Sequence, residues 1–132
     1  MIKACIFDMD GTVSDTINSI TYFGNKALAE NGLSGFAPDD YKYMVGNGAN
    51  ILVRRMLEKN GCTDEALYKK VLKEYNESYD DDFLYLTAPY DGILPLLDDL
   101  RAAGIRTGVL SNKPHETTLK VAEALFGDRL DL

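Results

Sequence analysis

Two carboxylates, Asp8 and Asp10, lie in a short motif whose residue types suit phosphoryl chemistry. The motif, D-M-D-G-T at residues 8–12, directly follows an apolar run that ends at Phe7. Because the chain turns beyond a strand end, both carboxylates can face one pocket, where their mutual repulsion calls for a cation. Magnesium, a hard ion that prefers oxygen ligands, meets that need. Gly11 lets the backbone approach a phosphate closely.

A second polar pair, Ser111 and Asn112, follows another apolar run at residues 105–110. Ligands of α/β sheets bind beyond the carboxyl ends of the strands. A hydroxyl and an amide there can donate hydrogen bonds to phosphate oxygens, supported by the N-terminus of the next helix. By itself each motif has a plainer interpretation, an acidic turn or a helix cap. The two together, separated by a helical segment, favour a phosphate site.

The elements that must position these motifs are two strands, predicted at residues 2–7 and 105–110. Both are short apolar runs of the kind typical of buried strands. Apolar residues at steps of three and four predict helices between and after them. The predicted helices cover residues 15–31, 38–45, 51–60, 63–82, 93–103 and 114–126, and Gly46, Asn47 and Gly48 separate the second from the third.

This order predicts an α/β fold: a Rossmann-like parallel-sheet core interrupted by an inserted helical cap domain. The core is predicted at residues 1–14 and 89–132 and the cap at residues 15–88. Two strands make a poor sheet, so the core is expected to be incomplete and the chain to be cut short. The uncovered flank of such a core predicts self-association.

Composition narrows the range of partners. The chain has 132 residues, 45% of them hydrophobic, a net charge of −7 and a pI of about 4.6. An acidic surface repels nucleic acid and anionic membranes, so neither is expected as a partner. No apolar run approaches the roughly 18 residues of a membrane span, and the N-terminus does not resemble a signal peptide. These features predict a cytoplasmic protein with Cys5 and Cys62 as free thiols.

Five segments together resemble the haloacid dehalogenase superfamily. They are F-D-M-D-G-T at residues 7–12, D-T at 15–16, V-G-N-G at 45–48, Y-D-G-I at 90–93 and S-N-K-P at 111–114. Their order and spacing are similar to those of phosphoglycolate phosphatases, and the resemblance covers essentially the whole chain. It implies a Mg²⁺-dependent hydrolase that acts on a small phosphorylated metabolite.

The resemblance also implies a role for each motif residue. Asp8 would be the nucleophile that forms an aspartyl-phosphate, and would also bind Mg²⁺. Asp10 would be the general acid and base, with its backbone carbonyl a metal ligand. The residues implied to bind phosphate or substrate, or to shape their loops, are Gly11, Thr12, Ser111, Asn112, Gly46, Asn47 and Gly48. Arg54 is a weaker candidate for contact with a substrate anion.

The sequence departs from the family pattern toward its end. The family has a later lysine and an acidic pair that completes the metal site, and neither is found in its expected context. Lys113 is interpreted mainly as a residue leading into the last helix, and Asp128 and Asp131 as part of a connection. The chain by itself is therefore expected to show little or no activity.

Three other functions stay open at this point. One is a relative of β-phosphoglucomutase, and another is a pyrophosphatase-like enzyme. The third is a non-catalytic module that binds Mg²⁺ or phosphate, or that accepts a phosphoryl group as a response-regulator receiver does.

Overall fold

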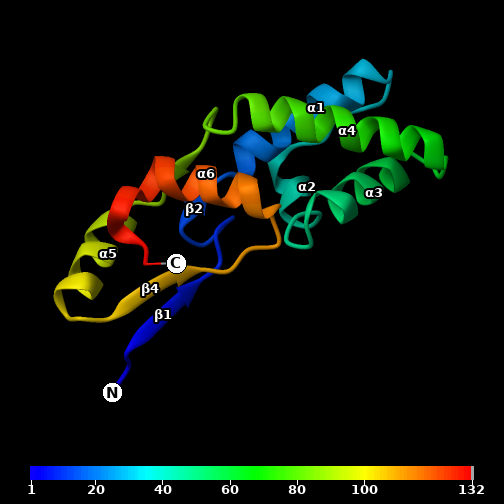
Figure 1. The fold of residues 1–132 in the computed structure, drawn as a ribbon. Helices are drawn as coiled ribbons and strands as arrows, with labels where there is room; N and C mark the ends of the chain where they lie inside the picture. The colour runs from blue at the N-terminus through cyan, green and yellow to red at the C-terminus, as the bar shows by residue number, and fades with distance from the viewer. Residues whose placement is uncertain (132) are drawn as a thin grey trace. The chain divides into compact units, whose positions relative to one another are not determined.

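The computed structural model describes residues 1–131 and divides into two compact units (Figure 1). The core unit consists of Met1–Thr16 together with the chain from Leu86 onward. The helical unit is Ile17–Tyr85. Assignment of residues 15–88 as a functional cap stays a prediction.

The core unit is built on two parallel strands, β1 (Ala4–Phe7) and β4 (Arg106–Val109). They pair in register from Ala4 opposite Arg106 to Phe7 opposite Val109. Two helices, α5 (Ile93–Ala102) and α6 (His115–Phe126), and a short 3-10 turn, η1 (Gly127–Arg129), also belong to this unit. This arrangement confirms the predicted α/β class with a parallel sheet.

A second, very short ladder lies in the same unit. Strand β2 (Ser14–Asp15) pairs antiparallel with β3 (Ala88–Pro89). The prediction that a helix begins at Asp15 is therefore wrong: α1 begins at Ile17, because the backbone of Ser14 and Asp15 is extended and bonded to a segment more than 70 residues later. Helical spacing in the sequence cannot reveal such a pairing.

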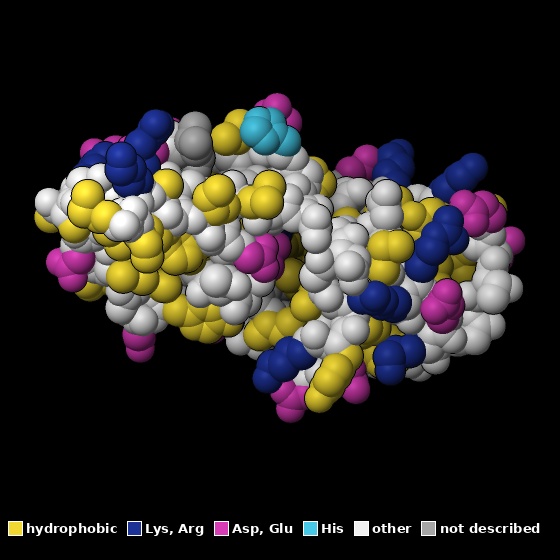
Figure 2. Space-filling view, turned by 90° about the horizontal axis from the view of Figure 1, so that it is seen from below, with side chains coloured by type: hydrophobic (Ala, Val, Ile, Leu, Met, Phe, Trp, Pro, Cys, Tyr) yellow, Lys and Arg dark blue, Asp and Glu magenta, His cyan; other side chains and the backbone are white. Residues whose placement is uncertain are grey.

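Within residues 1–131, helices α5 and α6 cover one face of the β1–β4 sheet and leave the other face open. An apolar core lies between these helices and the sheet, and at its centre are Leu97 and Phe126, both at most 1% exposed. Val13, Phe7 and Val109 pack with them. On the opposite face Ile6 and Leu110 are 73% and 74% exposed. Figure 2 shows hydrophobic side chains reaching the surface in this part of the chain. The prediction of fully buried strands is thus wrong, since an apolar run does not reveal how many of its faces are covered.

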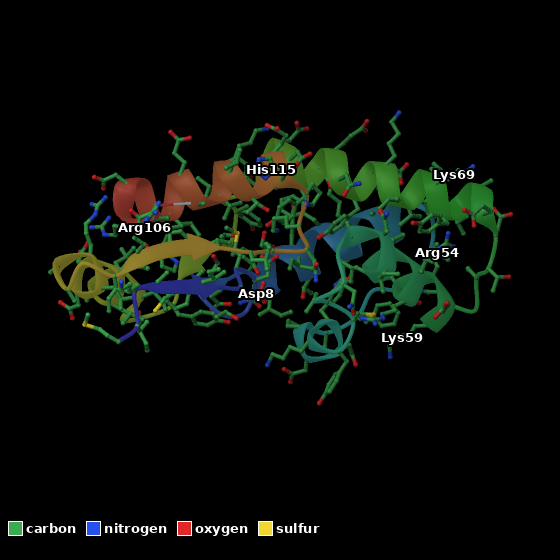
Figure 3. The ribbon with its side chains drawn as sticks, turned by 60° about the horizontal axis from the view of Figure 1, so that its bottom comes forward. Asp8, Arg54, Lys59, Lys69, Arg106 and His115 are labelled. Atoms are coloured by element: carbon green, nitrogen blue, oxygen red, sulfur yellow. The ribbon has the colours of Figure 1, made fainter. Side chains whose placement is uncertain are left out.

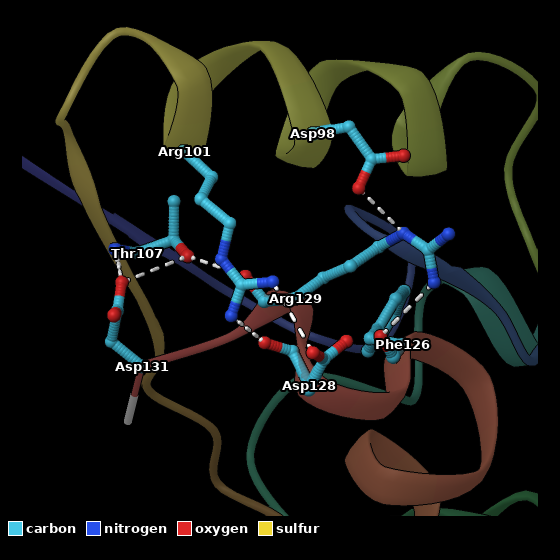
Figure 4. A network of polar contacts seen from close by, with 7 residues as sticks. All are labelled: Asp98, Arg101, Thr107, Phe126, Asp128, Arg129 and Asp131. Carbon is cyan, nitrogen blue, oxygen red and sulfur yellow. Dashed lines mark hydrogen bonds and ion pairs between the residues drawn. The ribbon is translucent and has the colours of Figure 1, made fainter.

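The segment after α6 folds back onto the free edge of β4 (Figure 4). The Thr107 amide donates to Asp131 Oδ2 at 2.7 Å, and the Asp131 amide donates to the Thr107 carbonyl at 2.8 Å. Arg129 pairs with Asp98 at 2.9 Å, and Arg101 donates to the Asp128 carbonyl. In the described structure Asp128 and Asp131 therefore make structural contacts at this edge.

Replacing Asp131 with alanine is expected to destabilise the core unit by about 1–3 kcal/mol. The change leaves the amide of Thr107, a residue only 3% exposed, without its carboxylate acceptor. Urea unfolding followed by circular dichroism measures the loss. Asp98→Ala is the matched control, because it breaks an exposed ion pair worth at most about 1 kcal/mol. Equal effects of the two changes would contradict the expectation.

The helical unit contains four helices around a separate apolar core. They are α1 (Ile17–Glu30), α2 (Pro38–Lys42), α3 (Ala49–Lys59) and α4 (Glu65–Asp81). The core side chains lie at helical spacing on the inner faces, as the sequence pattern predicts, and include Phe23, Leu28, Tyr41, Met56 and Val71. Asp64 caps α4, because its carboxylate accepts from the Leu67 amide at 2.7 Å, and the helix therefore begins two residues later than predicted.

Tyr41 is buried in the core of the helical unit and makes the stability of that unit depend on pH. Its hydroxyl donates to Asn25 Oδ1 at 2.9 Å, and burial raises its pKa above the ordinary value of about 10. The unfolded chain ionises above that pH while the folded chain holds Tyr41 neutral. The contribution of Tyr41 to the free energy of unfolding is therefore fully present below about pH 10 and is lost as the pH rises further.

Tyr41→Phe is accordingly expected to flatten the fall of stability between pH 9 and 11 by roughly 1 kcal/mol. Urea midpoints at several alkaline pH values measure the slope, which separates this effect from the constant loss of the hydrogen bond. Tyr43→Phe, at a side chain 85% exposed, serves as the control and should keep the slope of the unmodified chain. Identical slopes for both variants would refute this origin of the pH dependence.

Candidate functional site

A tight loop after β1 holds Asp8 and Asp10. The buried Met9 anchors the loop: its carbonyl accepts from the amides of Val13 and Ser14 at 3.1 and 3.0 Å. Gly11 has a φ of +79°, a conformation that favours glycine. Asp8 is exposed and lies just beyond the tip of β1, as Figure 3 shows. Its Oδ1 accepts from the Met9 amide at 2.9 Å.

Two side chains contact Asp10 at one carboxylate oxygen, one through a hydrogen bond and one through an ion pair. The Thr16 hydroxyl donates to Asp10 Oδ1 at 2.8 Å, and Lys113 Nζ lies 3.4 Å from the same atom. The Lys113 side chain is only 8% exposed and that of Asp10 22%. Interpreting Lys113 mainly as a residue leading into the last helix is therefore incomplete. Its position directly after the Ser-Asn pair at a strand end was the signal that could have identified it.

The second predicted motif lies at the same end of the sheet. Leu110 N donates to the Phe7 carbonyl at 2.9 Å, so the chain leaves both strands side by side. Ser111 Oγ then accepts from the Lys113 amide at 3.1 Å. Through Lys113 the structure thus connects the Ser111–Asn112 segment with Asp10. Gly11 and Thr12 lie in the loop between Asp10 and β2, and both are exposed.

The predicted residues of the helical unit form a loop of their own. Gly46 and Gly48 have φ values of +106° and +83°, and Gly48 precedes α3. Asn47 Oδ1 accepts from Arg55, which also donates to the Met44 carbonyl at 2.8 Å. Arg55, which the sequence did not single out, therefore orders this loop.

Arg54, the weaker candidate for an anion contact, is engaged within the helical unit. Its guanidinium pairs with Glu65 at 3.3 Å and lies over the Tyr68 ring. The hydrogen bonds that Arg54 donates to the Glu65 carboxylate raise the pKa of Arg54. A substrate anion would have to displace the Glu65 carboxylate from Arg54. The contacts of Arg54 therefore do not favour a role in substrate binding.

The residues around Asp8 offer the oxygen ligands that Mg²⁺ prefers. Mg²⁺ is commonly held by one or two carboxylates together with waters and substrate phosphate oxygens. The exposed carboxylate of Asp8 and the backbone carbonyl of Asp10 fit that pattern. Within residues 1–131 no group of three or more His, Cys, Asp or Glu side chains is gathered closely enough to hold a metal. The fit therefore depends on one or two protein ligands and on the phosphate itself.

The fold is therefore a parallel α/β fold with two carboxylates and a lysine beyond neighbouring strand ends, which is where open α/β sheets bind their ligands. The chain belongs to the haloacid dehalogenase-like hydrolases, whose family model matches residues 2–131. No helix among the described residues has the length and apolar composition that crossing a membrane requires.

Several proteins resemble the chain over most of its length. It is 37% identical over 130 residues to a phosphoglycolate phosphatase of Rhodospirillum rubrum, covering 95% of this chain and 54% of the relative. A phosphoglycolate phosphatase of Cereibacter sphaeroides is 33% identical, with 92% of this chain and 56% of the relative covered. The chain spans about half the length of these curated relatives.

A solved structure gives the same result at the level of the fold. A protein of Lactobacillus delbrueckii subsp. bulgaricus, provisionally named a phosphoglycolate phosphatase, superimposes with a TM-score of 0.90 at 31% identity. The match covers 98% of this chain and 62% of that protein. The predicted membership of the haloacid dehalogenase superfamily is thus confirmed.

Proposed function

We propose that this chain carries the phosphoryl-accepting site of a Mg²⁺-dependent phosphomonoesterase that acts on a small metabolite such as 2-phosphoglycolate. The observation that supports this most strongly is the parallel pairing of β1 with β4. It brings the Asp8–Asp10 loop and the Ser111–Lys113 segment to one end of the sheet, connected by the Lys113–Asp10 contact. Similarity to proteins named phosphoglycolate phosphatases supports the substrate class.

The chemistry proceeds in two displacements at phosphorus. An Asp8 carboxylate oxygen attacks, a bond forms between that oxygen and phosphorus, and the bond from phosphorus to the substrate alcohol breaks. Asp10 gives its proton to the departing alkoxide. Asp10 then takes a proton from water, whose oxygen attacks phosphorus, and inorganic phosphate leaves as the Asp8 carboxylate is restored. A bound Mg²⁺ supplies charge neutralisation at the phosphoryl oxygens.

Other residues bind the phosphoryl group or the rest of the substrate in this proposal. The Ser111 hydroxyl and the Asn112 amide donate to phosphoryl oxygens, and Gly11 and Thr12 shape the loop beside them. The loop at residues 46–48 contacts the organic part of the substrate, and the helical unit acts as a cap that excludes water. Self-association through an uncovered flank of the core and a cytoplasmic location stay predictions.

Beryllofluoride, which mimics an aspartyl-phosphate, provides the direct test. With Mg²⁺ present, fluorine NMR is expected to show a bound species that disappears when Mg²⁺ is chelated. Turnover of 2-phosphoglycolate is expected to be slow, because the described residues contain no further acidic cluster for the metal. Absence of binding at millimolar beryllofluoride and Mg²⁺ would reject the proposal.

A substrate panel distinguishes the alternatives. Release of inorganic phosphate from 2-phosphoglycolate, however slow, supports the phosphatase. Conversion of β-glucose 1-phosphate to glucose 6-phosphate would instead support a mutase, and faster hydrolysis of pyrophosphate would support a pyrophosphatase. The names of the similar proteins favour the first of these outcomes.

A further inference from the structure

We infer that Lys113 is a positioning residue for Asp10, holding its carboxyl group in the orientation in which it exchanges protons with the substrate oxygen. This inference rests on the proposed function, in which Asp10 is the acid and base. Neither the family match nor the names of the similar proteins assign a role to this lysine.

Burial of the Lys113 ammonium group costs free energy unless a charged or polar partner compensates for the lost water. An ammonium group removed from water loses its hydration and needs charged or polar partners in compensation. The Lys113 side chain is 92% removed from solvent, since 8% remains exposed, and its Nζ lies 3.4 Å from Asp10 Oδ1. A lysine that served only to begin a helix would keep its ammonium group in water, whereas that of Lys113 is buried beside Asp10.

The contacts to Asp10 differ between its two oxygens. Thr16, itself buried, donates to Oδ1, and Lys113 approaches the same atom. In the part of the chain that the structure describes, both of these contacts meet at Oδ1 rather than at Oδ2. The hydrogen bond and the ion pair at Oδ1 restrict the rotation of the carboxyl group, and in this inference Oδ2 is the atom that exchanges the proton. Asp10 keeps 22% of its side chain exposed, so a substrate oxygen can reach it.

The backbone around Lys113 makes its placement rigid. Ser111 Oγ accepts from the Lys113 amide at 3.1 Å, and α6 begins two residues later at His115. The lysine therefore extends from a fixed turn beyond β4 toward the loop that follows β1. This turn couples the orientation of Asp10 to the segment that is proposed to bind the phosphoryl group.

A comparison of two phosphoryl donors separates positioning of an acid from a general structural role. The alcohol of 2-phosphoglycolate must be protonated as it leaves, whereas the acetate of acetyl phosphate leaves without a proton. Lys113→Met is expected to slow phosphorylation of Asp8 by 2-phosphoglycolate about a hundredfold, in line with the size of general acid catalysis. With acetyl phosphate the slowing should stay below about threefold. A structural defect would slow both reactions equally.

Two further variants complete the experiment, which is run under single-turnover conditions with Mg²⁺. Lys113→Arg keeps the charge and is expected to restore the 2-phosphoglycolate rate to within about tenfold of the unmodified chain. Lys120→Met, at an exposed lysine of α6, should leave both rates within about twofold. Equal slowing with both donors, or no recovery with arginine, overturns the role of Lys113 but leaves the proposed function intact.

A double-mutant cycle tests the contact without depending on catalysis. Lys113→Met and Asp10→Asn, made singly and together, are expected to show a coupling of about tenfold in the unfolding equilibrium constant. A coupling below about twofold overturns the inference. If neither donor phosphorylates the unmodified chain, the proposed function fails, and the role of Lys113 in catalysis fails with it.

Discussion

Replacing Asp8 with asparagine is expected to abolish phosphorylation of the chain by acetyl phosphate, with a loss of at least about a thousandfold in rate. The amide has nearly the same shape as the carboxylate but is a poor nucleophile, and it forms no stable acyl phosphate. Asp8 is exposed and accepts one described hydrogen bond, from the Met9 amide. The amide oxygen of asparagine can still accept that bond, so the fold should persist.

Mass spectrometry of the intact chain after reaction with acetyl phosphate and Mg²⁺ measures this loss. Asp99→Asn, at an exposed carboxylate on α5, is the matched control and should be phosphorylated like the unmodified chain. Asp10→Asn should still accept the phosphoryl group from acetyl phosphate but lose it to water roughly a hundredfold more slowly. A phosphoryl group found on Asp8→Asn at an undiminished rate would show that another residue is the nucleophile.

Phe126→Ala is expected to destabilise the core unit by about 3–5 kcal/mol, enough to unfold a marginal domain. Phe126 is fully buried at the end of α6. The apolar core that it fills has few other completely buried members, chiefly Val13 and Leu97. The surrounding side chains of a close-packed core relax only partly into the cavity that alanine would leave.

Amide hydrogen exchange in β1 and β4 is the most direct measure of this loss, and thermal unfolding gives its overall size. Leu119→Ala lies on the same helix at a side chain 50% exposed and should cost less than about 1 kcal/mol. If the two variants exchange their strand amides at the same rate, the core does not depend on Phe126.

The local elements of this protein could be predicted from sequence because their signals are local. Apolar residues at steps of three and four indicated the helices, and glycines with positive φ, such as Gly32 and Gly104, end two of them. The order of predicted strands and helices indicated the α/β class, and five short motifs, D-M-D-G-T among them, indicated the superfamily. Element boundaries shifted by a few residues, as at Ile17, where a distant strand partner decides the start.

Contacts between distant parts of the chain were decided only by the tertiary structure. The Lys113–Asp10 ion pair joins residues more than 100 positions apart, and the Asp131–Thr107 contact closes a strand edge that no periodicity describes. Exposure of Ile6 likewise depends on which elements cover the sheet. Sequence patterns record the preferences of neighbouring residues, whereas the pairing of charges and the covering of a face depend on separations in space that only the folded chain sets.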